Sequence, residues 1–312
     1  MALNAAVLGA GFIGQNFIRR AILRGYSLRV LDHNDVAKEF EDKLTWIRGD
    51  FSSEDAVRKA IHGVDVVFHF ISSTVPGDMV DEGGELMQNV VQTLQLLKLC
   101  VRENIRRIVF ISSASVYGVQ AMLPVHEGAS TDPISSHGIH KLAIEKYLQL
   151  YTYQHGLDCK IMRLSNPYGP GQSVTGRQGF IAIAIGRMLA GEKIEIRGDG
   201  TIVRDFIYID DVVEALDLAA TCQAKEGIFN VGSGRGYSLN EIIEIMGRVT
   251  GKPVAIKYVA SRFTDIPASI LDISREKDIL GKAHKVSLEH GLAKTLAFHG
   301  IKVAPEFLAA EQ

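Results

Sequence analysis

The sequence predicts an α/β protein, a doubly wound parallel sheet with a smaller α+β lobe toward the C-terminal end of the chain. Apolar runs of strand length recur along the first half, amphipathic segments of helix length separate them, and a glycine-rich turn follows the first run. Near-continuous strands of Val, Ile, Leu and Phe that alternate with helices are typical of a parallel sheet covered on both faces.

Seven strands are predicted for the main sheet: residues 5–8, 28–31, 44–47, 64–70, 108–112, 160–164 and 228–231. Helices fall in the gaps, and two of them span 85–102 and 142–153. Beyond Asn166 the alternation breaks. A loop rich in Gly and Pro over 167–179 precedes a helix, and residues 193–197 and 254–258 are predicted as short strands outside the main sheet. The strand at 228–231 and a helix that starts at Asp210 return to the large domain.

We therefore expect two domains. Residues 1–165, with returns at about 205–235, form the large domain, and residues 166–204 and 236–312 form the smaller lobe. Helix 85–102 is apolar on more than one face, whereas a surface helix normally has one polar face. Two interpretations follow. The helix is buried between the sheet and its neighbours, or it shares a subunit interface with helix 142–153, which predicts a homodimer.

The composition excludes several classes of protein. The 312 residues are 46% hydrophobic and carry a net charge of −2 without long runs of one sign, which argues against a nucleic-acid or membrane-surface partner. The longest apolar stretch, residues 180–185, is too short to span a bilayer. The first strand begins almost at Met1, which leaves no room for a signal peptide. Cys100, Cys159 and Cys222 are expected to be reduced core residues, which favours the cytoplasm.

A dinucleotide-binding turn is the strongest motif in the sequence. Gly9, Gly11 and Gly14 follow the first apolar strand directly and open a helix. In such a Rossmann βαβ unit the first two glycines allow a tight turn and a close approach of pyrophosphate to backbone N–H groups, and the third lets the helix pack on the strand. Phe12 and Ile13 lie inside the turn. We expect these five residues to bind the cofactor.

The acidic residue at the end of the second strand selects the dinucleotide. Asp32 lies 18 residues after Gly14, where a carboxylate accepts hydrogen bonds from the adenosine ribose and repels a 2′-phosphate. The residues that follow, His33 and Asn34, provide no arginine for that phosphate. NAD is therefore expected rather than NADP, and His33 is a further candidate contact.

Further motifs carry a resemblance to a known family. They are Gly49-Asp50-Phe51, Phe68-His69-Phe70, Asn89, the run Ser112-Ser113-Ala114-Ser115-Val116-Tyr117-Gly118, and Arg204-Asp205-Phe206. With them the chain resembles, over nearly its whole length, the extended short-chain dehydrogenase/reductases, and most of all their UDP-sugar 4-epimerases. The resemblance implies that Asp50 and Phe51 hold the adenine, that Phe70 and Ser72 line the cofactor, and that Asn89 is a further cofactor contact. The family's usual first glycine corresponds to Leu8, and Gly9 restores a spacing that binds dinucleotides.

The resemblance also implies a reaction. In 4-epimerases hydride leaves C4 of the sugar for NAD while a base takes the O4 proton, and the hydride then returns to the other face. The family uses a hydroxyl, matched here by Ser113, and a Tyr-x-x-x-Lys pair whose spacing puts both side chains on one helical face. The lysine, matched by Lys141, fixes the nicotinamide ribose and lowers the pKa of the tyrosine, since a phenol with a pKa near ~10 is a poor base at neutral pH.

The tyrosine position of that pair is His137 in this chain. Three interpretations are open. In the first, neutral His137 is the acid/base, because imidazole with its pKa of about 6.5 needs no activation, and its shorter reach requires a bridging water or a shifted substrate. In the second, the site binds NAD and a nucleotide sugar with little or no turnover. In the third, the chemistry differs and His140 serves as the acid. A metal held by His137 and His140 has no evident third ligand.

Residues that match the family's substrate contacts predict a UDP-linked sugar. Asn166 matches an asparagine on the pyrophosphate, Arg204 and Arg262 match the two arginines that clamp it, and Asp265 matches a carboxylate on the uridine ribose. Guanidinium groups suit pyrophosphate because they form charge-assisted, often bidentate hydrogen bonds to its oxygens. Ser269 stands where members restricted to plain hexoses carry a bulky aromatic residue, so we expect room for an N-acetylhexosamine.

Within the family the epimerase branch is favoured, with a C4 ketoreductase as the alternative. The dehydratases carry an Asp-Glu pair directly after the hydroxyl residue, where this chain has Ala114 and Ser115. An epimerase of this kind would feed the synthesis of surface polysaccharide. A function of another class, a protein that binds NAD or a nucleotide sugar without catalysis, stays open because of His137.

Overall fold

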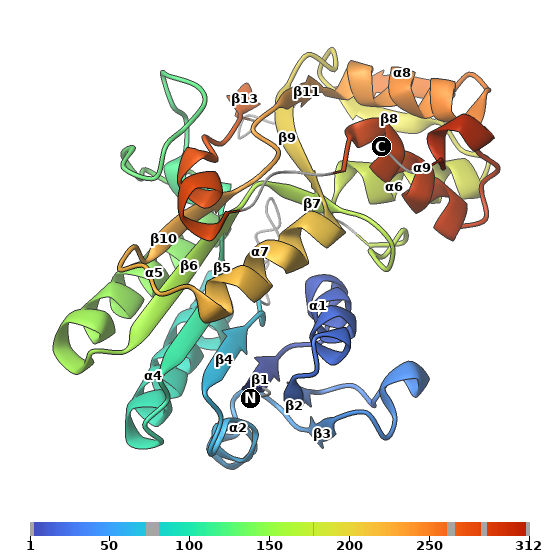
Figure 1. The fold of residues 1–312 in the computed structure, drawn as a ribbon. Helices are drawn as coiled ribbons and strands as arrows, with labels where there is room; N and C mark the ends of the chain where they lie inside the picture. The colour runs from blue at the N-terminus through green and yellow to red at the C-terminus, as the bar shows by residue number, and fades with distance from the viewer. Residues whose placement is uncertain (1–2, 73–80, 177, 261–265, 282–285, 310–312) are drawn as a thin grey trace. The chain divides into compact units, whose positions relative to one another are not determined.

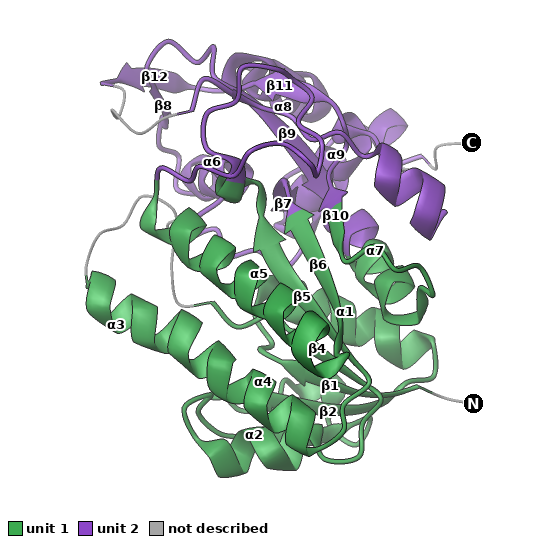
Figure 2. Cartoon of the chain, turned by 90° about the vertical axis from the view of Figure 1, so that its left-hand side faces the viewer, with its two compact units in different colours: residues 1–116, 135–163, 213–229 green, residues 117–134, 164–212, 230–312 purple. Residues whose placement is uncertain are grey.

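The computed structural model describes residues 3–72, 81–176, 178–260, 266–281 and 286–309. Two compact units divide the chain (Figure 2). Unit 1 comprises residues 1–116, 135–163 and 213–229, and unit 2 comprises residues 117–134, 164–212 and 230–312.

Unit 1 is built on a seven-stranded sheet with the order β10-β6-β5-β4-β1-β2-β3 (Figure 1). Its strands are β1 (Asn4–Leu8), β2 (Ser27–Asp32), β3 (Thr45–Arg48), β4 (Val66–His69), β5 (Arg107–Ser113), β6 (Asp158–Leu164) and β10 (Ile228–Val231). Strand β1 pairs in parallel with β2 and β4, β2 with β3, and β4 with β5. All seven predicted strands are confirmed. They were predictable because a buried parallel strand is a continuous apolar run in the sequence.

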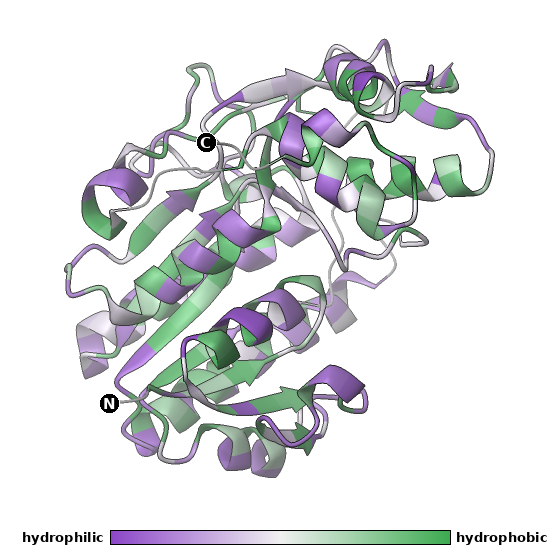
Figure 3. Cartoon of the chain, turned by 45° about the vertical axis from the view of Figure 1, so that its right-hand side comes forward, coloured by the Kyte–Doolittle hydropathy of each residue, from purple (hydrophilic) through white to green (hydrophobic). Residues whose placement is uncertain are grey.

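Helices cover both faces of this sheet. Helices α2 (Glu54–Ile61), α4 (Gln92–Arg102) and α5 (Ser136–His155) lie on one face, and α1 (Phe12–Leu23) and α7 (Ile209–Thr221) lie on the other (Figure 2). The core packs Leu97 and Cys100 of α4 and Ile144 and Leu148 of α5 with apolar strand residues, and all four are at most 2% exposed. Figure 3 shows the strands of the sheet as mainly hydrophobic and the helices as mixed. The doubly wound fold is therefore confirmed.

The helix predicted over 85–102 begins earlier and is not uniform. It consists of α3 (Glu82–Leu86), a π-helical turn η2 (Met87–Val91) and α4. Asp81 caps its start, since the side chain accepts a hydrogen bond from the Gly84 N–H over 2.9 Å. A π turn contains one extra residue, so the side chains after it point in directions rotated from those before it. This explains why the apolar residues of the helix predicted over 85–102 do not form a single stripe.

The helix predicted over 142–153 also begins earlier. Ser135 caps α5 by accepting a hydrogen bond from Gly138 N–H over 3.1 Å, and Gly156 ends the helix in the left-handed conformation, with φ of +67°. His137 is therefore the second residue of the helix. The helix, its cap included, begins with the polar residues Ser135-Ser136-His137, so the periodicity of apolar residues does not mark its first turn.

Unit 2 holds two smaller sheets. Strands β7 (Asn166–Tyr168), β9 (Val203–Tyr208), β11 (Gly236–Ser238) and β13 (Ala268–Ser269) form one, and β8 (Ile194–Arg197) pairs in parallel with β12 (Ile256–Val259) in the other. The helices are α6 (Phe180–Leu189), α8 (Leu239–Thr250) and α9 (Leu288–Phe298). Short turns complete the chain: η1 (Lys38–Phe40), η3 (Ala114–Tyr117), η4 (Glu276–Leu280) and η5 (Pro305–Phe307).

Two expectations for single residues were wrong. The helix expected to start at Asp210 begins one residue earlier, at Ile209, directly after β9 ends at Tyr208. The buried apolar residues run from the strand into the first helical turn, so hydropathy does not mark the boundary. Cys222 was expected in the core but is only half-buried, whereas Cys100 and Cys159 are buried free thiols as predicted.

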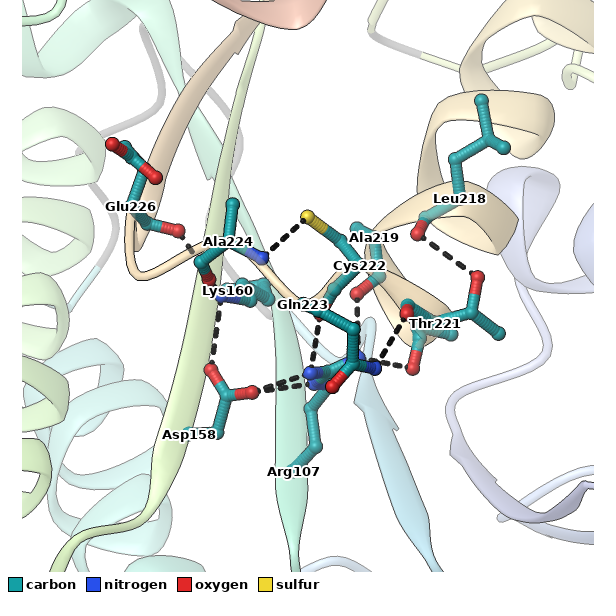
Figure 4. Close-up of polar contacts among 11 residues, drawn as sticks. Arg107, Asp158, Lys160, Leu218, Ala219, Thr221, Cys222, Gln223, Ala224 and Glu226 are labelled. Atoms are coloured by element: carbon teal, nitrogen blue, oxygen red, sulfur yellow. Dashed lines mark hydrogen bonds and ion pairs between the residues drawn. The ribbon is translucent and has the colours of Figure 1, made fainter. Parts of the chain in front are cut away.

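A buried cationic cluster in unit 1 joins the end of α7 to the sheet (Figure 4). Arg107, at the start of β5, donates two hydrogen bonds to Asp158 Oδ2, over 2.8 and 2.5 Å, and Lys160 lies 3.1 Å from Asp158 Oδ1. The two cations also donate to backbone carbonyls, those of Ala219, Ala220 and Cys222 from Arg107 and those of Ala224 and Glu226 from Lys160. Positive groups are favourable at this position because the carbonyls at the end of a helix carry partial negative charge.

Candidate functional site

The glycine turn between β1 and α1 requires glycine at two positions for different reasons. Gly9 has a φ of +98°, and a Cβ there would lie 2.9 Å from Ile71 Cγ1. A Cβ on Gly14 would overlap the carbonyl oxygen of Gly9. At Gly11, the N-cap of α1, a Cβ would meet no atom within 4 Å, and no side chain of the described residues caps the helix. The first amides of α1 are thus directed at a space where an anion can be bound.

Asp32 ties the end of β2 to this turn. Its Oδ2 accepts a hydrogen bond from Ala10 N–H over 2.7 Å, and its Oδ1 accepts from the backbone and the side chain of Asn34 over 2.9 and 3.0 Å. The Asp32 side chain is 7% exposed, whereas the neighbouring His33 side chain is 77% exposed. Phe12 and Ile13 are half-buried in the first turn of α1. The predicted cofactor residues of this part of the chain therefore lie around one turn.

The residues expected to hold the adenine follow β3, and those expected to line the cofactor follow β4. Hydrogen bonds from Ser52 hold the pKa of the Asp50 carboxyl below its usual value. The Phe51 ring is half-buried, with its centroid 5.1 Å from that of His69, and Phe70 lies 5.5 Å from the Phe17 ring. Ser72 is exposed.

Asn89 is buried in the π turn η2, where its side-chain amide donates to the Glu85 carbonyl over 2.8 Å. Such π-helical turns inside α-helices are frequent at functional sites.

The three predicted catalytic residues lie in unit 1, at the end of β5 and the start of α5. Ser113 is the last residue of β5 and accepts a hydrogen bond from Ser115 N–H over 3.1 Å. His137 and Lys141 are one turn apart on α5, and His137 is half-buried. The ammonium of Lys141 donates to the Ile111 carbonyl over 2.8 Å and lies 4.8 Å from the centre of the Phe110 ring. This hydrogen bond joins the start of α5 to the end of β5.

The Lys141 ammonium is poorly solvated. Burial lowers its pKa from 10.5 to about 8, and the nearby Glu145 carboxylate opposes the shift. In the unfolded chain the same group keeps its proton up to pH 10.5. The charged lysine therefore destabilises the native state at pH values below about 8, and this penalty is relieved as the pH rises from 8 to 10.5, where only the unfolded state still binds the proton.

We expect Lys141→Met to raise the free energy of unfolding by about 1–2 kcal/mol at pH 7 and to weaken NAD binding. The substitution removes a desolvation penalty of about 3 kcal/mol, and the Ile111 carbonyl that loses its donor offsets about 1–2 kcal/mol of the gain. Urea denaturation at pH 7 and pH 10 checks this, and the gain should shrink at the higher pH. Lys146→Met, at an exposed position of the same helix, is the control. A destabilised Lys141→Met protein would contradict the prediction.

Two buried histidines lie close to these residues in the sequence or the fold. His140 is 6% exposed, and its Nδ1 has no hydrogen-bond partner among the described residues. His69, at the end of β4, bonds Thr93 Oγ1 through Nε2 over 2.9 Å. Burial and the positive charge of Lys141 lower the pKa of His69 to about 3, so it is neutral at physiological pH.

The residues expected at the substrate lie in unit 2. Asn166, on β7, donates to the Asp205 carbonyl over 2.8 Å, and Arg204, on β9, is half-buried and donates to the Val203 carbonyl over 2.8 Å. Ser269 is paired with Arg204 across β13 and β9. Asn166, Arg204 and Ser269 are therefore brought together on one sheet. Arg262 and Asp265 lie outside the described residues.

The sequence assigned no role to two buried acids, Asp205 and Glu145. Asp205 is 1% exposed and accepts hydrogen bonds from Ser233, Gly234 and Leu271, so it fixes the loop after β10 and the segment after β13 to β9. Glu145 is 0% exposed and pairs with Arg163. For Glu145 the signals were its spacing of four residues from Lys141 and an arginine inside the apolar strand β6.

No group of three or more His, Cys, Asp or Glu able to hold a metal ion occurs among the described residues. In the same part of the chain, no helix has the length and apolar character needed to cross a membrane.

Known proteins resemble the chain over nearly its full length. The sequence profile of the NAD dependent epimerase/dehydratase family matches residues 5–232. A UDP-glucose 4-epimerase of Mycolicibacterium smegmatis is 32% identical over 299 residues, which cover 93% of this chain and 96% of that protein.

Solved structures agree. One is a UDP-glucose 4-epimerase from Thermotoga maritima, crystallised with UDP-glucose, which has 31% identity and a TM-score of 0.89 and covers 96% of this chain and 99% of its own. Another is a UDP-N-acetylglucosamine 4-epimerase from Methanobrevibacter ruminantium in complex with UDP-N-acetylmuramic acid. It has 29% identity and a TM-score of 0.89, and the two chains are covered to 96% and 98%.

Proposed function

Because the chain belongs to the NAD dependent epimerase/dehydratase family, we propose that it is an NAD-dependent 4-epimerase of a UDP-hexose or UDP-N-acetylhexosamine. The observation that carries the proposal is the continuous similarity, in sequence and fold, to 4-epimerases of UDP-glucose and UDP-N-acetylglucosamine. The glycine turn with Asp32 supports NAD as the cofactor, since a carboxylate at that position favours a free ribose 2′-hydroxyl.

In this proposal each residue of unit 1 has a separate task. The first amides of α1 bind the pyrophosphate, Asp32 binds the adenosine ribose, and Lys141 holds the nicotinamide ribose. NAD held by these residues would supply the acceptor for the hydride of C4 of the sugar and the donor that returns it to the opposite face. Ser113 donates a hydrogen bond to O4, and His137 takes and returns the O4 proton.

In unit 2, Asn166 and Arg204, with Arg262, bind the pyrophosphate of the substrate, Asp265 binds the uridine ribose, and Ser269 lies beside the sugar. We further propose that residues 1–165, with returns at about 205–235, are the NAD-binding domain and that residues 166–204 and 236–312 are the substrate lobe.

The test is an assay of the purified chain with UDP-glucose and UDP-N-acetylglucosamine, in which the 4-epimers are separated by chromatography. A native mass spectrum shows whether NAD co-purifies. We expect bound NAD and epimerisation of at least one substrate without added cofactor, because the NAD is restored in each turnover. Bound NAD with no turnover of any UDP-sugar would favour a binding protein instead, and a reduced product formed with consumption of NADH would favour the ketoreductase.

The substrate range is expected to depend on Ser269. We expect Ser269→Tyr to reduce kcat/KM for UDP-N-acetylglucosamine by about 10–200-fold, the range in which steric discrimination in a pocket operates, while UDP-glucose is still turned over. Ser274→Tyr, on the same segment but not matched to a substrate position, is the control. Equal losses for both sugars would contradict a role in selecting the C2 substituent.

We also propose that the protein is a cytoplasmic homodimer that supplies polysaccharide synthesis. The apolar stripe Ile139, Ala143, Tyr147 and Leu150 on α5 supports a dimer, because Ile139, Tyr147 and Leu150 are 53, 38 and 41% exposed. Light scattering after size exclusion checks this. We expect a dimer for the natural chain and a folded monomer for the Ile139→Lys/Leu150→Lys variant, whereas a monomeric natural chain would contradict the proposal.

A further inference from the structure

Glu145 and Arg163 form an ion pair inside unit 1 that the proposed reaction does not use. The two side chains are 1% and 3% exposed, and Arg163 Nη2 lies 2.6 Å from Glu145 Oε2, while its Nε donates to Oε1 over 3.0 Å. A buried pair of this kind gives little net stability compared with apolar residues of the same volume, because both ions must be desolvated. Its presence therefore needs another explanation.

The pair is connected to both elements that present the catalytic residues. Glu145 Oε1 accepts a short hydrogen bond from the Ser112 hydroxyl, and Ser112 directly precedes Ser113 on β5. On α5, Glu145 is one turn after Lys141, whose ammonium binds the carbonyl of Ile111. Two successive residues of β5, Ile111 and Ser112, are thus bonded by two residues one turn apart on α5. This double contact fixes the register of the helix on the strand.

The pair also determines the charges close to the Lys141 ammonium. Glu145 is an opposite charge that favours the ammonium form of Lys141. Arg163, on β6, pairs with this carboxylate and is itself a charge of the same sign as the ammonium. From β4, His69 faces the lysine as a neutral imidazole, and from β5 the contacts are the Ile111 carbonyl and the Phe110 ring. The protonation of Lys141 thus depends on its burial and on one carboxylate, which Arg163 holds in place.

We infer that Glu145 is a positioning residue, which with Arg163 holds Lys141 and Ser113 in register and keeps the Lys141 ammonium charged in an apolar setting. This role rests on the function proposed above, since it concerns the lysine assigned to the nicotinamide ribose. Glu145 acts through Ser112 and Lys141 and is not assigned a contact with the reacting atoms.

The test measures the titration of Lys141 in the full chain without nucleotide, by NMR of protein labelled with ¹³C at lysine Cε and assigned by loss of the signal in Lys141→Met. We expect Glu145→Gln to move the pKa of Lys141 down by about one unit and Arg163→Met to move it up by a similar amount. In the double variant, from which both charges are gone, the displacement should be smaller than in either single variant. Fluorescence titrations with NADH should show the pH dependence of binding displaced in the same directions.

The opposite signs separate this role from simple support of the fold. Loss of packing would lower stability in every variant but gives no reason for pKa displacements of opposite direction. If Glu145→Gln fails to fold, Arg163→Met and the double variant decide, because the upward displacement and its cancellation are still measurable. An unchanged pKa of Lys141, or displacements of the same sign, would overturn the inference. The titration needs no sugar and no turnover, so its failure is distinct from a failure of the epimerase assay.

Discussion

Substitution of His137 by alanine is expected to reduce 4-epimerisation by about 10²–10⁴-fold, the usual contribution of a positioned acid/base, with little change in NAD affinity. His137 is half-buried in the first turn of α5, one turn before Lys141. A neutral imidazole accepts a proton at neutral pH, whereas a phenol at this position needs its pKa lowered by the lysine. The substitution therefore removes the base and leaves the ribose contact in place.

The pH profile distinguishes histidine from tyrosine as the base. With His137, activity should fall as the pH drops through the imidazole range near about 6.5, because the protonated ring cannot take the O4 proton. In His137→Tyr this acid limb should move to higher pH, because a phenol titrates near ~10 unless a neighbouring cation lowers its pKa. The measurement is kcat/KM between pH 5 and 9 for the natural chain and this variant.

Two controls decide among the three interpretations of this position. Ser136→Ala, next to His137 and bonded to Glu85 over 3.1 Å, should keep activity. If His137→Ala is fully active and His140→Ala is not, the chemistry belongs to His140. A natural chain that is silent with every UDP-sugar, together with a gain of activity in His137→Tyr, would identify a binding protein that has lost its catalytic tyrosine.

The main sheet was predictable from sequence because its order depends on local features. The strands are continuous apolar runs, and the turn contains Gly9 and Gly14 at positions where a larger side chain would clash with its neighbours. The short strands β7, β11 and β13 have two or three residues each and exist through their pairing with β9, so no local pattern marks them. Residue 209 shows the same limit, since the change from strand to helix occurs inside one apolar run.

The residues of the candidate site were predictable where they belong to a sequence motif, as do Ser113, His137 and Lys141. The roles of Glu145 and Asp205 were not predicted, because they depend on partners distant in sequence. Glu145 gains its role from Arg163 on β6, and Asp205 from amides at Ser233 and Leu271. A charged residue inside an apolar strand, such as Arg163 or Arg107, is the signal that a buried partner exists. The sequence does not say which acid that partner is.

Arg107→Met is expected to lower the free energy of unfolding of unit 1 by about 3–5 kcal/mol, the range for breaking a buried ion pair or charged hydrogen-bond network. Arg107 is 5% exposed and donates to Asp158 and to the carbonyls of Ala219, Ala220 and Cys222 (Figure 4). Methionine fills a similar volume but donates no hydrogen bond, so these carbonyls at the end of α7 lose their charged donor.

The loss of stability in Arg107→Met should begin near the end of α7, and hydrogen exchange should detect it there. Hydrogen exchange of the amides near the end of α7 should accelerate in Arg107→Met before the rest of the sheet is affected, because Lys160 still binds Asp158 and the loop carbonyls of Ala224 and Glu226. The matched control is Arg102→Met, in which an exposed arginine loses an ion pair with Glu54 and less than about 1 kcal/mol is expected. Equal destabilisation by the two substitutions would show that the carbonyl contacts of Arg107 contribute nothing beyond an ordinary surface pair. A difference of several kcal/mol would show that the last turn of α7 depends on a cation supplied by the neighbouring strand.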